Sequence, residues 1–389
     1  MDEVRNPFSP GAGTKPPELA GRDDIIRAAE ISVQRVLAGR AAQSQMLLGL
    51  RGVGKTVLLN KIEDIARDHG HKTSFIEAPE DRKLVDLLYP KMAQVLRQLS
   101  VVENAKAKTK VALAALRSFA SAFKVEMGDF SFGVEAASGV ADSGNLESDL
   151  AEIFISIGEA GRAAGSAWTL LIDEVQYLKD HELAALIVAI HRSNQKGLPV
   201  LFFGAGLPQI AALAGDAKSY AERLFIYPPI DALPESAAKE AIGQPIADEG
   251  ETIESAALQA IVNRTRGYPY FLQEWGFQAW NVSEKSPITE DDVKVAADFA
   301  LRRLDDGFFK VRFDRLTPKE RDYVIAMAKL GSGPYRSSDV ADILGEKMNA
   351  LGPRRATIIA KGMIYSPSHG DIAFTVPMFD EYLKRHWGA

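Results

Sequence analysis

Gly49-Leu50-Arg51-Gly52-Val53-Gly54-Lys55-Thr56 fits the pattern G-x-x-x-x-G-K-[ST]. The apolar run 45–50 before it predicts a buried strand, and a helix is predicted over 55–69 after it. Glycines permit the backbone angles that turn successive N–H groups inward, so such a loop suits phosphate oxygens. A glycine-rich turn with a chance lysine is the alternative, and the flanking strand and helix disfavour it.

The loop predicts bound ATP with Mg²⁺. Lys55 would bridge the β- and γ-phosphates, and the Thr56 hydroxyl would ligate the metal. The helix that starts here adds partial positive charge at its N-terminus. The residues expected to contact the nucleotide are Gly49, Leu50, Arg51, Gly52, Val53, Gly54, Lys55, Thr56 and Val57.

Two carboxylates follow a second buried strand. The run Trp168–Ile172 is apolar and leads into Asp173 and Glu174. Asp173 would hold Mg²⁺, directly or through water, and Glu174 would orient and polarise the attacking water. A solvated acidic turn is the alternative for such a pair alone, but the loop upstream favours catalysis. The predicted reaction is the hydrolysis of ATP to ADP and phosphate.

Strands alternate with helices through the first 230 residues. The predicted strands are 45–50, 73–78, 168–172, 200–203 and 224–227, and the predicted helices are 24–38, 55–69, 82–99, 105–123, 146–164 and 180–195. This alternation predicts an α/β fold whose parallel sheet has helices on both faces. A hairpin or exposed ribbon is predicted at 124–135. From Pro228 onward the pattern becomes all helical.

These patterns divide the chain into four parts. We expect a flexible arm at 1–17 and a P-loop core at 18–230, with an insert at about 101–146. A helical lid would follow at 231–313, and a separate C-terminal domain at 314–389.

Composition narrows the possible functions. The 389 residues include no cysteine, which excludes disulfides, thiolate nucleophiles and Cys-based zinc sites. A net charge of -6 gives no overall basic footprint for nucleic acid. His69 and His71 form an H-x-H that we interpret as a solvated loop rather than a metal site. No apolar stretch is long enough to span a membrane, and the polar N-terminus lacks a signal peptide's core, so a cytoplasmic protein is expected.

The order of these features resembles that of the AAA+ superfamily. A P-loop after a strand, a strand that ends in Asp173-Glu174, a further strand, a helical lid and a terminal winged helix look most like the Orc1/Cdc6-like ATPases and bacterial proteins with Orc1-like AAA domains. The similarity runs from Glu18 to the C-terminus and is specific in the two nucleotide motifs.

The resemblance implies roles for residues outside the two motifs. Leu19–Asp23 resembles a box that precedes the core, which would put Gly21 and Arg22 near the adenine or ribose. An N-cap region before a helix is the alternative. Arg223 resembles the arginine that in oligomeric relatives reaches a neighbour's γ-phosphate and stabilises the transition state. An ordinary surface ion pair is its alternative.

Two departures from the family pattern weaken the expectation of rapid turnover. Gly204-Ala205-Gly206 stands where many relatives place a polar sensor residue. Gly267-Tyr268-Pro269-Tyr270 lacks the arginine of a second sensor. It resembles STAND-type signalling NTPases instead, in which the proline lies near the base, so Pro269 is expected there. Both departures favour a slow nucleotide switch.

The C-terminal domain resembles a winged helix-turn-helix, with three short helices and a hairpin around Ser368-His369-Gly370-Asp371. Arg354, Arg355 and Lys361 on the third helix, predicted over 349–361, suit phosphate and groove contact with DNA. The segment 316–389 is barely basic, with 10 Lys and Arg against 8 Asp and Glu. A winged helix used for packing or protein contact is the alternative.

The leading hypothesis is therefore a DNA-associated AAA+ ATPase of mobile-element, replication or defence type. Its partners would be ATP, DNA through the winged helix, and further copies of the chain or another protein. The alternative is a STAND-like signalling switch that acts on a protein. A P-loop kinase is disfavoured, because the acidic pair, lid and winged helix have no role in phosphorylating a small acceptor.

Overall fold

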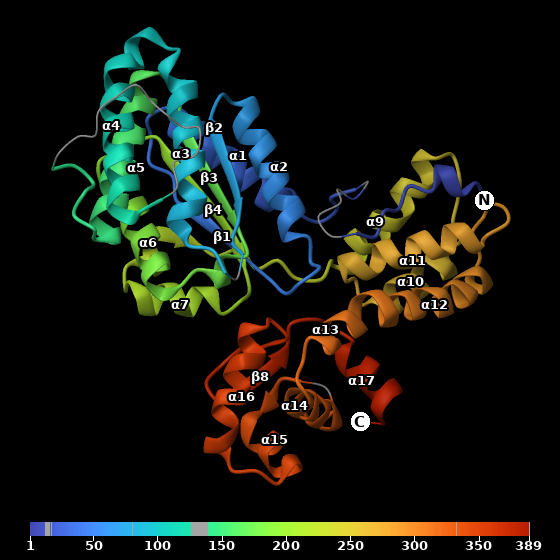
Figure 1. Cartoon of the computed structure of the whole chain (residues 1–389). Helices are drawn as coiled ribbons and strands as arrows, with labels where there is room; N and C mark the ends of the chain where they lie inside the picture. The colour runs from blue at the N-terminus through green and yellow to red at the C-terminus, as the bar shows by residue number, and fades with distance from the viewer. Residues whose placement is uncertain (12–15, 17, 80, 126–138, 332, 389) are drawn as a thin grey trace. The chain divides into compact units, whose positions relative to one another are not determined.

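The computed structural model describes residues 1–11, 16, 18–79, 81–125, 139–331 and 333–388 (Figure 1). The chain forms two compact units. The sheet unit consists of Arg22–Gly49 and Lys55–Ile230. The helical unit consists of Met1–Gly21, Leu50–Gly54 and Asp231–Ala389, so the middle of the glycine-rich loop is grouped with the C-terminal half of the chain.

Five parallel strands form the sheet, in the order β2-β3-β4-β1-β5. They are β1 (Ser44–Leu48), β2 (Lys72–Glu77), β3 (Trp168–Asp173), β4 (Val200–Gly206) and β5 (Phe225–Ile226). β3 and β4 are buried along their whole length, as expected for apolar strands inside a parallel sheet. The register pairs Ile172 with Gly204 and Leu48 with Gly206, so β1, β3 and β4 have their carboxyl ends side by side at the same end of the sheet. The predicted α/β fold is confirmed.

Helices cover both faces of this sheet. α1 (Asp23–Leu37) and α2 (Lys55–Asp68) lie on one face, and α3 (Leu84–Ser100), α5 (Leu146–Ala163) and α6 (Asp180–Gln195) lie on the other (Figure 1). α4 (Lys106–Phe123) packs against α3 and α5. In the core, the ring of Trp168 lies 4.7 Å from that of Phe154, and its Nε1 donates to Ser74 Oγ (3.1 Å). The short helices α7 (Ile210–Ala217) and α8 (Ala221–Leu224) were not predicted.

The helical unit contains the remaining elements. α9 (Glu235–Asp248), α10 (Ser255–Thr265), α11 (Pro269–Val282), α12 (Glu290–Leu304) and α13 (Lys310–Asp314) come first, with a π-helical turn at Asp305–Phe309. α14 (Pro318–Lys329), α15 (Ser337–Leu344), α16 (Met348–Ala360) and α17 (Phe379–Trp387) follow. The short strands β6 (Tyr335–Arg336), β7 (Ile364–Tyr365) and β8 (Asp371–Phe374) form an antiparallel sheet in the order β6-β8-β7. We call residues 316–388 the C-terminal domain.

The N-terminal segment differs from the flexible arm predicted at 1–17. A 3-10 turn forms at Glu3–Arg5, and Phe8 is buried. Asn6 Nδ2 donates to the Phe277 carbonyl of α11 (3.1 Å). A Cβ on Gly276 would lie 2.8 Å from the Phe8 ring, so a glycine in α11 makes room for it. Residues 1–11 thus pack against α11 through Asn6 and Phe8, although their polar composition predicted no regular structure.

One prediction cannot be compared. The hairpin predicted at 124–135 falls, apart from its first two residues, on 126–138, outside the described residues. No described helix is both long enough and apolar enough to cross a membrane.

Candidate nucleotide-binding site

The phosphate loop follows β1 directly. The Gly49 N–H donates to the carbonyl of Gly206 at the end of β4 (3.1 Å). Gly52 and Gly54 have φ angles of 84° and 91°, which glycine adopts without strain. Lys55 is buried, and its Nζ donates to the Gly49 carbonyl (2.9 Å). The lysine therefore folds back on its own loop, which puts its charge where such a loop holds an anion.

Thr56 and Asp173 are in contact at the carboxyl end of the sheet, where β1 and β3 end. The Thr56 hydroxyl donates to Asp173 Oδ2 (2.5 Å), and the Glu174 N–H donates to Asp173 Oδ1 (2.8 Å). Burial raises the pKa of Asp173, the hydrogen bond from Thr56 opposes this rise, and the charge of Glu174 adds to it. A carboxylate destabilised by burial favours a cation beside it.

These oxygens fit Mg²⁺. The ion takes oxygen ligands and often binds one or two protein groups together with substrate phosphates and water. Thr56 and Asp173 are the residues that would hold it. Within the described ranges, no group of three or more acidic or histidine side chains could hold a metal alone. A metal at this position would take water and the phosphates of the nucleotide as further ligands.

Glu174 has a left-handed backbone, with φ 54° and ψ 41°. This conformation is uncommon for a residue other than glycine and often marks a functional position. The Glu174 side chain is half-buried, and its Oε2 accepts a hydrogen bond from Nε2 of Gln176. Gln176 Oε1 accepts from the Leu207 N–H (3.2 Å). Sequence reasoning missed Gln176, whose place two residues after Glu174 is the only signal available.

The middle of the phosphate loop is held by groups of the helical unit. The Tyr268 hydroxyl donates to the Arg51 carbonyl, and the Tyr270 N–H donates to the Gly52 carbonyl (3.2 Å). The Arg51 N–H donates to the carbonyl of Thr375, which follows β8 (3.2 Å). A Cβ on Gly52 would lie 3.1 Å from the Tyr268 ring, so glycine permits this approach. Burial raises the pKa of the Tyr268 hydroxyl, which stays a donor.

Arg312 of α13 adds a partly buried charge to the same region. Its guanidinium stacks on the Phe308 ring (3.8 Å to the centroid), and Nη1 donates to the Phe308 carbonyl (2.8 Å). Its Nε has no hydrogen-bond partner among the residues that the structure describes. Burial and, after it, the charge of Arg51 lower the pKa of Arg312 to about 10. From the sequence, the lack of a second-sensor arginine near Pro269 could be recognised, but Arg312 could not be identified.

The predicted base-contacting residues have structural roles within their own units. Pro269 is the first residue of α11, between the two tyrosines that contact the loop. Gly21 has a φ of 67°, and a Cβ there would lie 2.7 Å from Ala237 Cβ. The Arg22 residue is the N-cap of α1, and its carbonyl accepts from the N–H groups of the first helical turn. Contact of these residues with the base stays a prediction.

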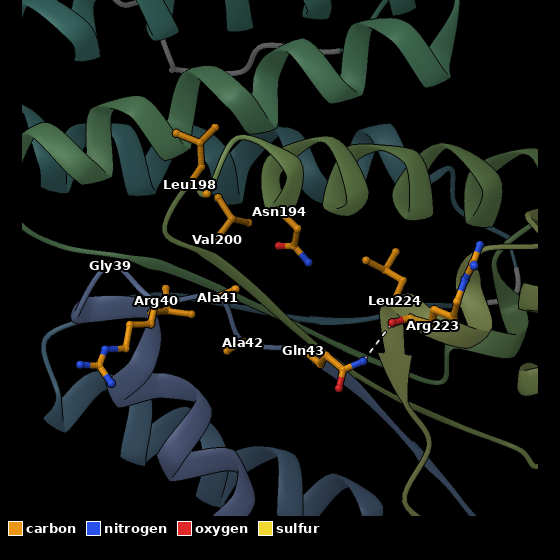
Figure 2. A pocket seen from close by; sticks show the side chains of 12 residues that line it. Gly39, Arg40, Ala41, Ala42, Gln43, Asn194, Leu198, Val200, Arg223 and Leu224 are labelled. Atoms are coloured by element: carbon orange, nitrogen blue, oxygen red, sulfur yellow. Dashed lines mark hydrogen bonds between the residues drawn. The ribbon is translucent and has the colours of Figure 1, made fainter.

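Arg223 lies just before β5, at the amino end of the parallel strands, whereas Thr56 and Asp173 lie at their carboxyl end. It is exposed, and no carboxylate pairs with it among the residues described. Its carbonyl accepts from Gln43 Nε2 (2.9 Å). The residue lines a cavity of about 210 Å³. In Figure 2 the Asn194 amide turns into this cavity, and the guanidinium groups of Arg40 and Arg223 extend away from it. The surface ion pair considered as an alternative for Arg223 is not observed.

The three cations predicted to contact DNA have partners inside the C-terminal domain. Arg354 makes a two-pronged pair with Glu346 (2.9 and 3.0 Å). Arg355 Nη1 donates to Ser337 Oγ (3.0 Å). Lys361 lies just past the end of α16, not within the predicted helix, and its Nζ donates to the buried Glu320 (2.6 Å). These side chains therefore support the domain's own packing.

The H-x-H pair divides into an exposed and a buried residue. His69 Nε2 lies 3.2 Å from Glu30 Oε1. His71 is buried, with Nδ1 2.7 Å from the Thr169 hydroxyl and Nε2 3.1 Å from the Val33 carbonyl. Burial lowers the pKa of His71 to about 4. The solvated loop predicted for both residues is wrong for His71, because two local partners satisfy its ring nitrogens in the core.

Two family models match parts of the chain. Residues 18–203 match the AAA ATPase domain, and residues 306–383 match a domain of unknown function (DUF8462). A comparison with curated proteins finds no match.

Several solved structures are similar over nearly the whole chain. A Walker-type ATPase of Pyrococcus abyssi is 16% identical, with a TM-score of 0.59, and the match covers 94% of this chain and 96% of that one. The RuvB Holliday junction branch migration motor of Thermotoga maritima is 17% identical, with a TM-score of 0.48 and coverage of 96% and 99%. The Orc1 protein of Aeropyrum pernix in complex with DNA is 11% identical, with a TM-score of 0.49 and coverage of 98% and 96%. The Pyrococcus match shows a common fold.

Proposed function

We propose that the chain is a nucleotide-dependent switch whose ATP-hydrolysing part is the segment 18–203, which matches the AAA ATPase domain. The observation that carries the proposal is the set of contacts on the middle of the phosphate loop. Leu50–Gly54 belong to the helical unit, where Tyr268, Tyr270 and Thr375 hydrogen-bond to Arg51 and Gly52. A ligand on this loop therefore changes contacts within the helical unit.

The chemistry of the switch rests on four residues. Lys55 would neutralise the β- and γ-phosphates, and Thr56 and Asp173 would hold Mg²⁺, which would offset the charge of the phosphates. Glu174 orients the attacking water and accepts its proton. Arg223, exposed and without a carboxylate partner in the described chain, is available to a second copy of the protein.

Electrostatics supports a link between the loop and the helical unit. The charge of Arg51 lowers the pKa of Arg312, so the two guanidinium groups repel each other within the helical unit. Phosphate on the loop would relieve this repulsion. Arg51 also donates its N–H to Thr375 of the C-terminal domain. Loss or gain of a phosphate then alters the energy of contacts that involve the C-terminal domain.

Tyr268→Phe tests the switch, because it removes the hydroxyl that donates to Arg51 and little else. Tyr335→Phe is the matched control, since its hydroxyl also donates to a backbone carbonyl of the helical unit, that of Gly331 (3.0 Å). Hydrogen exchange of the C-terminal domain would be compared with ADP, with a non-hydrolysable ATP analogue and without nucleotide. We expect nucleotide to change protection in wild type and Tyr335→Phe, and much less in Tyr268→Phe. Equal responses in all three proteins would contradict the proposal.

Association with DNA is the second candidate function. The order of α14, α15 and α16 with the small β-sheet favours it, because a three-helix unit with a hairpin commonly enters a DNA groove. Arg336 and Lys347 are exposed and flank α15, and Arg336 pairs with Asp371 of β8 (3.3 Å). The solvent-exposed residues of α16 are uncharged and mostly small: Met348, Asn349, Ala350, Pro353, Ala356, Thr357 and Ala360. A protein partner therefore fits α16 better than a phosphate backbone does, and a duplex titration at several salt concentrations separates the two.

A further inference from the structure

The carboxyl end of β4 contains a polar group that the local sequence does not supply. Gly204-Ala205-Gly206 has no polar side chain, yet Gln176 reaches this point from the turn Val175–Tyr177 after β3. Its Oε1 accepts from the Leu207 N–H (3.2 Å), and its Nε2 donates to Glu174 Oε2. Gln176 therefore connects the end of β4 with the carboxylate at the end of β3.

The backbone determines which way the Gln176 amide faces. The Leu207 N–H can only donate, so the amide oxygen must face it. The NH₂ group is then left facing Glu174, which as a carboxylate can only accept. Both contacts are satisfied in this orientation, and both would be lost if the amide were flipped. The Leu207 N–H, which follows β4, thus determines that Gln176 donates its hydrogen bond to Glu174.

Gly206 provides the space for this arrangement. A Cβ on Gly206 would lie 2.8 Å from Gln176 Oε1, closer than real Cβ atoms approach other atoms. A Cβ there would also lie 3.0 Å from Ile210 Cγ1, so glycine at this position leaves room for the Gln176 amide in this orientation.

We propose that Gln176 is a positioning residue for Glu174, in place of a polar side chain on β4. The inference rests on the proposed role of Glu174 in orienting water. Gln176 holds Oε2, which leaves Oε1 of the carboxylate for the attacking water. Positioning of this kind matters, because a displacement of about 1 Å in a reacting group costs up to about 100-fold in rate.

The test compares ATP turnover and ATP affinity in single variants. Gln176→Ala and Gln176→Glu should lower kcat by about 10- to 100-fold and leave ATP affinity nearly unchanged. Gln176→Glu keeps the size and an acceptor for Leu207, but it sets a like charge against Glu174. Gly206→Ala should have the same effect, since it displaces Gln176 without altering it. Gln244→Ala, an exposed glutamine of α9 that bonds Asp248 (2.7 Å), is the control.

A double variant separates positioning from a merely structural role. If Gln176 acts through Glu174, then adding Gln176→Ala to Glu174→Gln should lower kcat no further. If Gln176 only supports the fold, the two losses should multiply and the melting temperature should fall with them. That result, or wild-type kcat in Gln176→Glu, would overturn the inference. Wild-type kcat in Glu174→Gln alone would instead reject the proposed role of Glu174.

Discussion

Two charged residues of the nucleotide site hydrogen-bond to neutral groups, whereas two cations of the C-terminal domain pair with carboxylates. Lys55 is buried against the Gly49 carbonyl, and Asp173 is buried against the Thr56 hydroxyl, so each charge has a neutral hydrogen-bond partner. Lys361 and Arg354 are instead paired with carboxylates of their own domain.

The difference separates charges kept for a ligand from charges used for folding. A buried charge that hydrogen-bonds to a neutral group retains part of its desolvation cost, which a ligand of opposite charge can offset. A cation already paired with a carboxylate has little to gain from a second anion. Sequence motifs alone cannot make this distinction, because Lys55, Arg354 and Lys361 all appear as basic residues at suitable spacing.

The largest effect is expected at the loop. Lys55→Ala should weaken ATP binding by about 100-fold, because the charge-assisted hydrogen bonds to phosphate are lost. Lys61→Ala, in the same helix, should bind ATP like wild type. A fluorescent-nucleotide titration measures both affinities. If Lys55→Ala keeps wild-type affinity, then Lys55 is not a phosphate ligand and the contrast between the two regions fails.

An intermediate effect is expected at the pair formed by Lys361 and Glu320. Lys361→Met should lower the free energy of unfolding of the C-terminal domain by about 2 kcal/mol at neutral pH, because Glu320 is left buried without its cation. The exposed neighbour Lys319→Met should change little. Hydrogen exchange of α14 in rising urea measures the loss in the full chain.

The same pair predicts a pH dependence. Burial acts to raise the pKa of Glu320, but hydrogen bonds from Lys361 and Thr317 outweigh it and lower the pKa below the ordinary 4.5. A carboxyl group whose pKa is lowered by folding stabilises the fold at any pH above its pKa in the unfolded state. This stabilisation is lost as the pH falls through the pKa of the folded state. Wild type and Lys361→Met should therefore become more alike in stability as pH falls below 4.5. A constant difference would show that the ion pair is not its source.

The smallest effect concerns DNA. Changing Arg354 and Arg355 together to alanine should leave the salt dependence of duplex binding unchanged, since both side chains have partners in the domain. Changing the exposed Lys347 to alanine, which has no carboxylate partner among the described residues, should reduce the slope of log K against log salt by up to about 1 if it contacts phosphate. A duplex titration at several salt concentrations measures both slopes. A reduced slope in the first pair would restore these arginines as DNA contacts.

Local sequence was sufficient for the sheet and for the two nucleotide motifs. Apolar runs such as Trp168–Ile172 are long enough to be recognised as buried strands, and glycine-rich loops between strand and helix have few other uses. The parallel order of the sheet then brings the ends of β1 and β3 to one edge, which is why Thr56 and Asp173 could be expected to meet. Each of these inferences depends on neighbours within a few residues along the chain.

Partners far apart in the sequence decided the rest. Lys361 is paired with Glu320, and Gln176 accepts from the N–H of Leu207. The backbone groups of Arg51 hydrogen-bond to Tyr268 and to Thr375 after β8. The sequence by itself determined that this chain has a P-loop and an acidic pair on a parallel sheet, because periodicity and glycine spacing express backbone geometry directly. Only the tertiary structure decided which charges stay available, since availability depends on burial and on pairing between segments that the sequence leaves far apart.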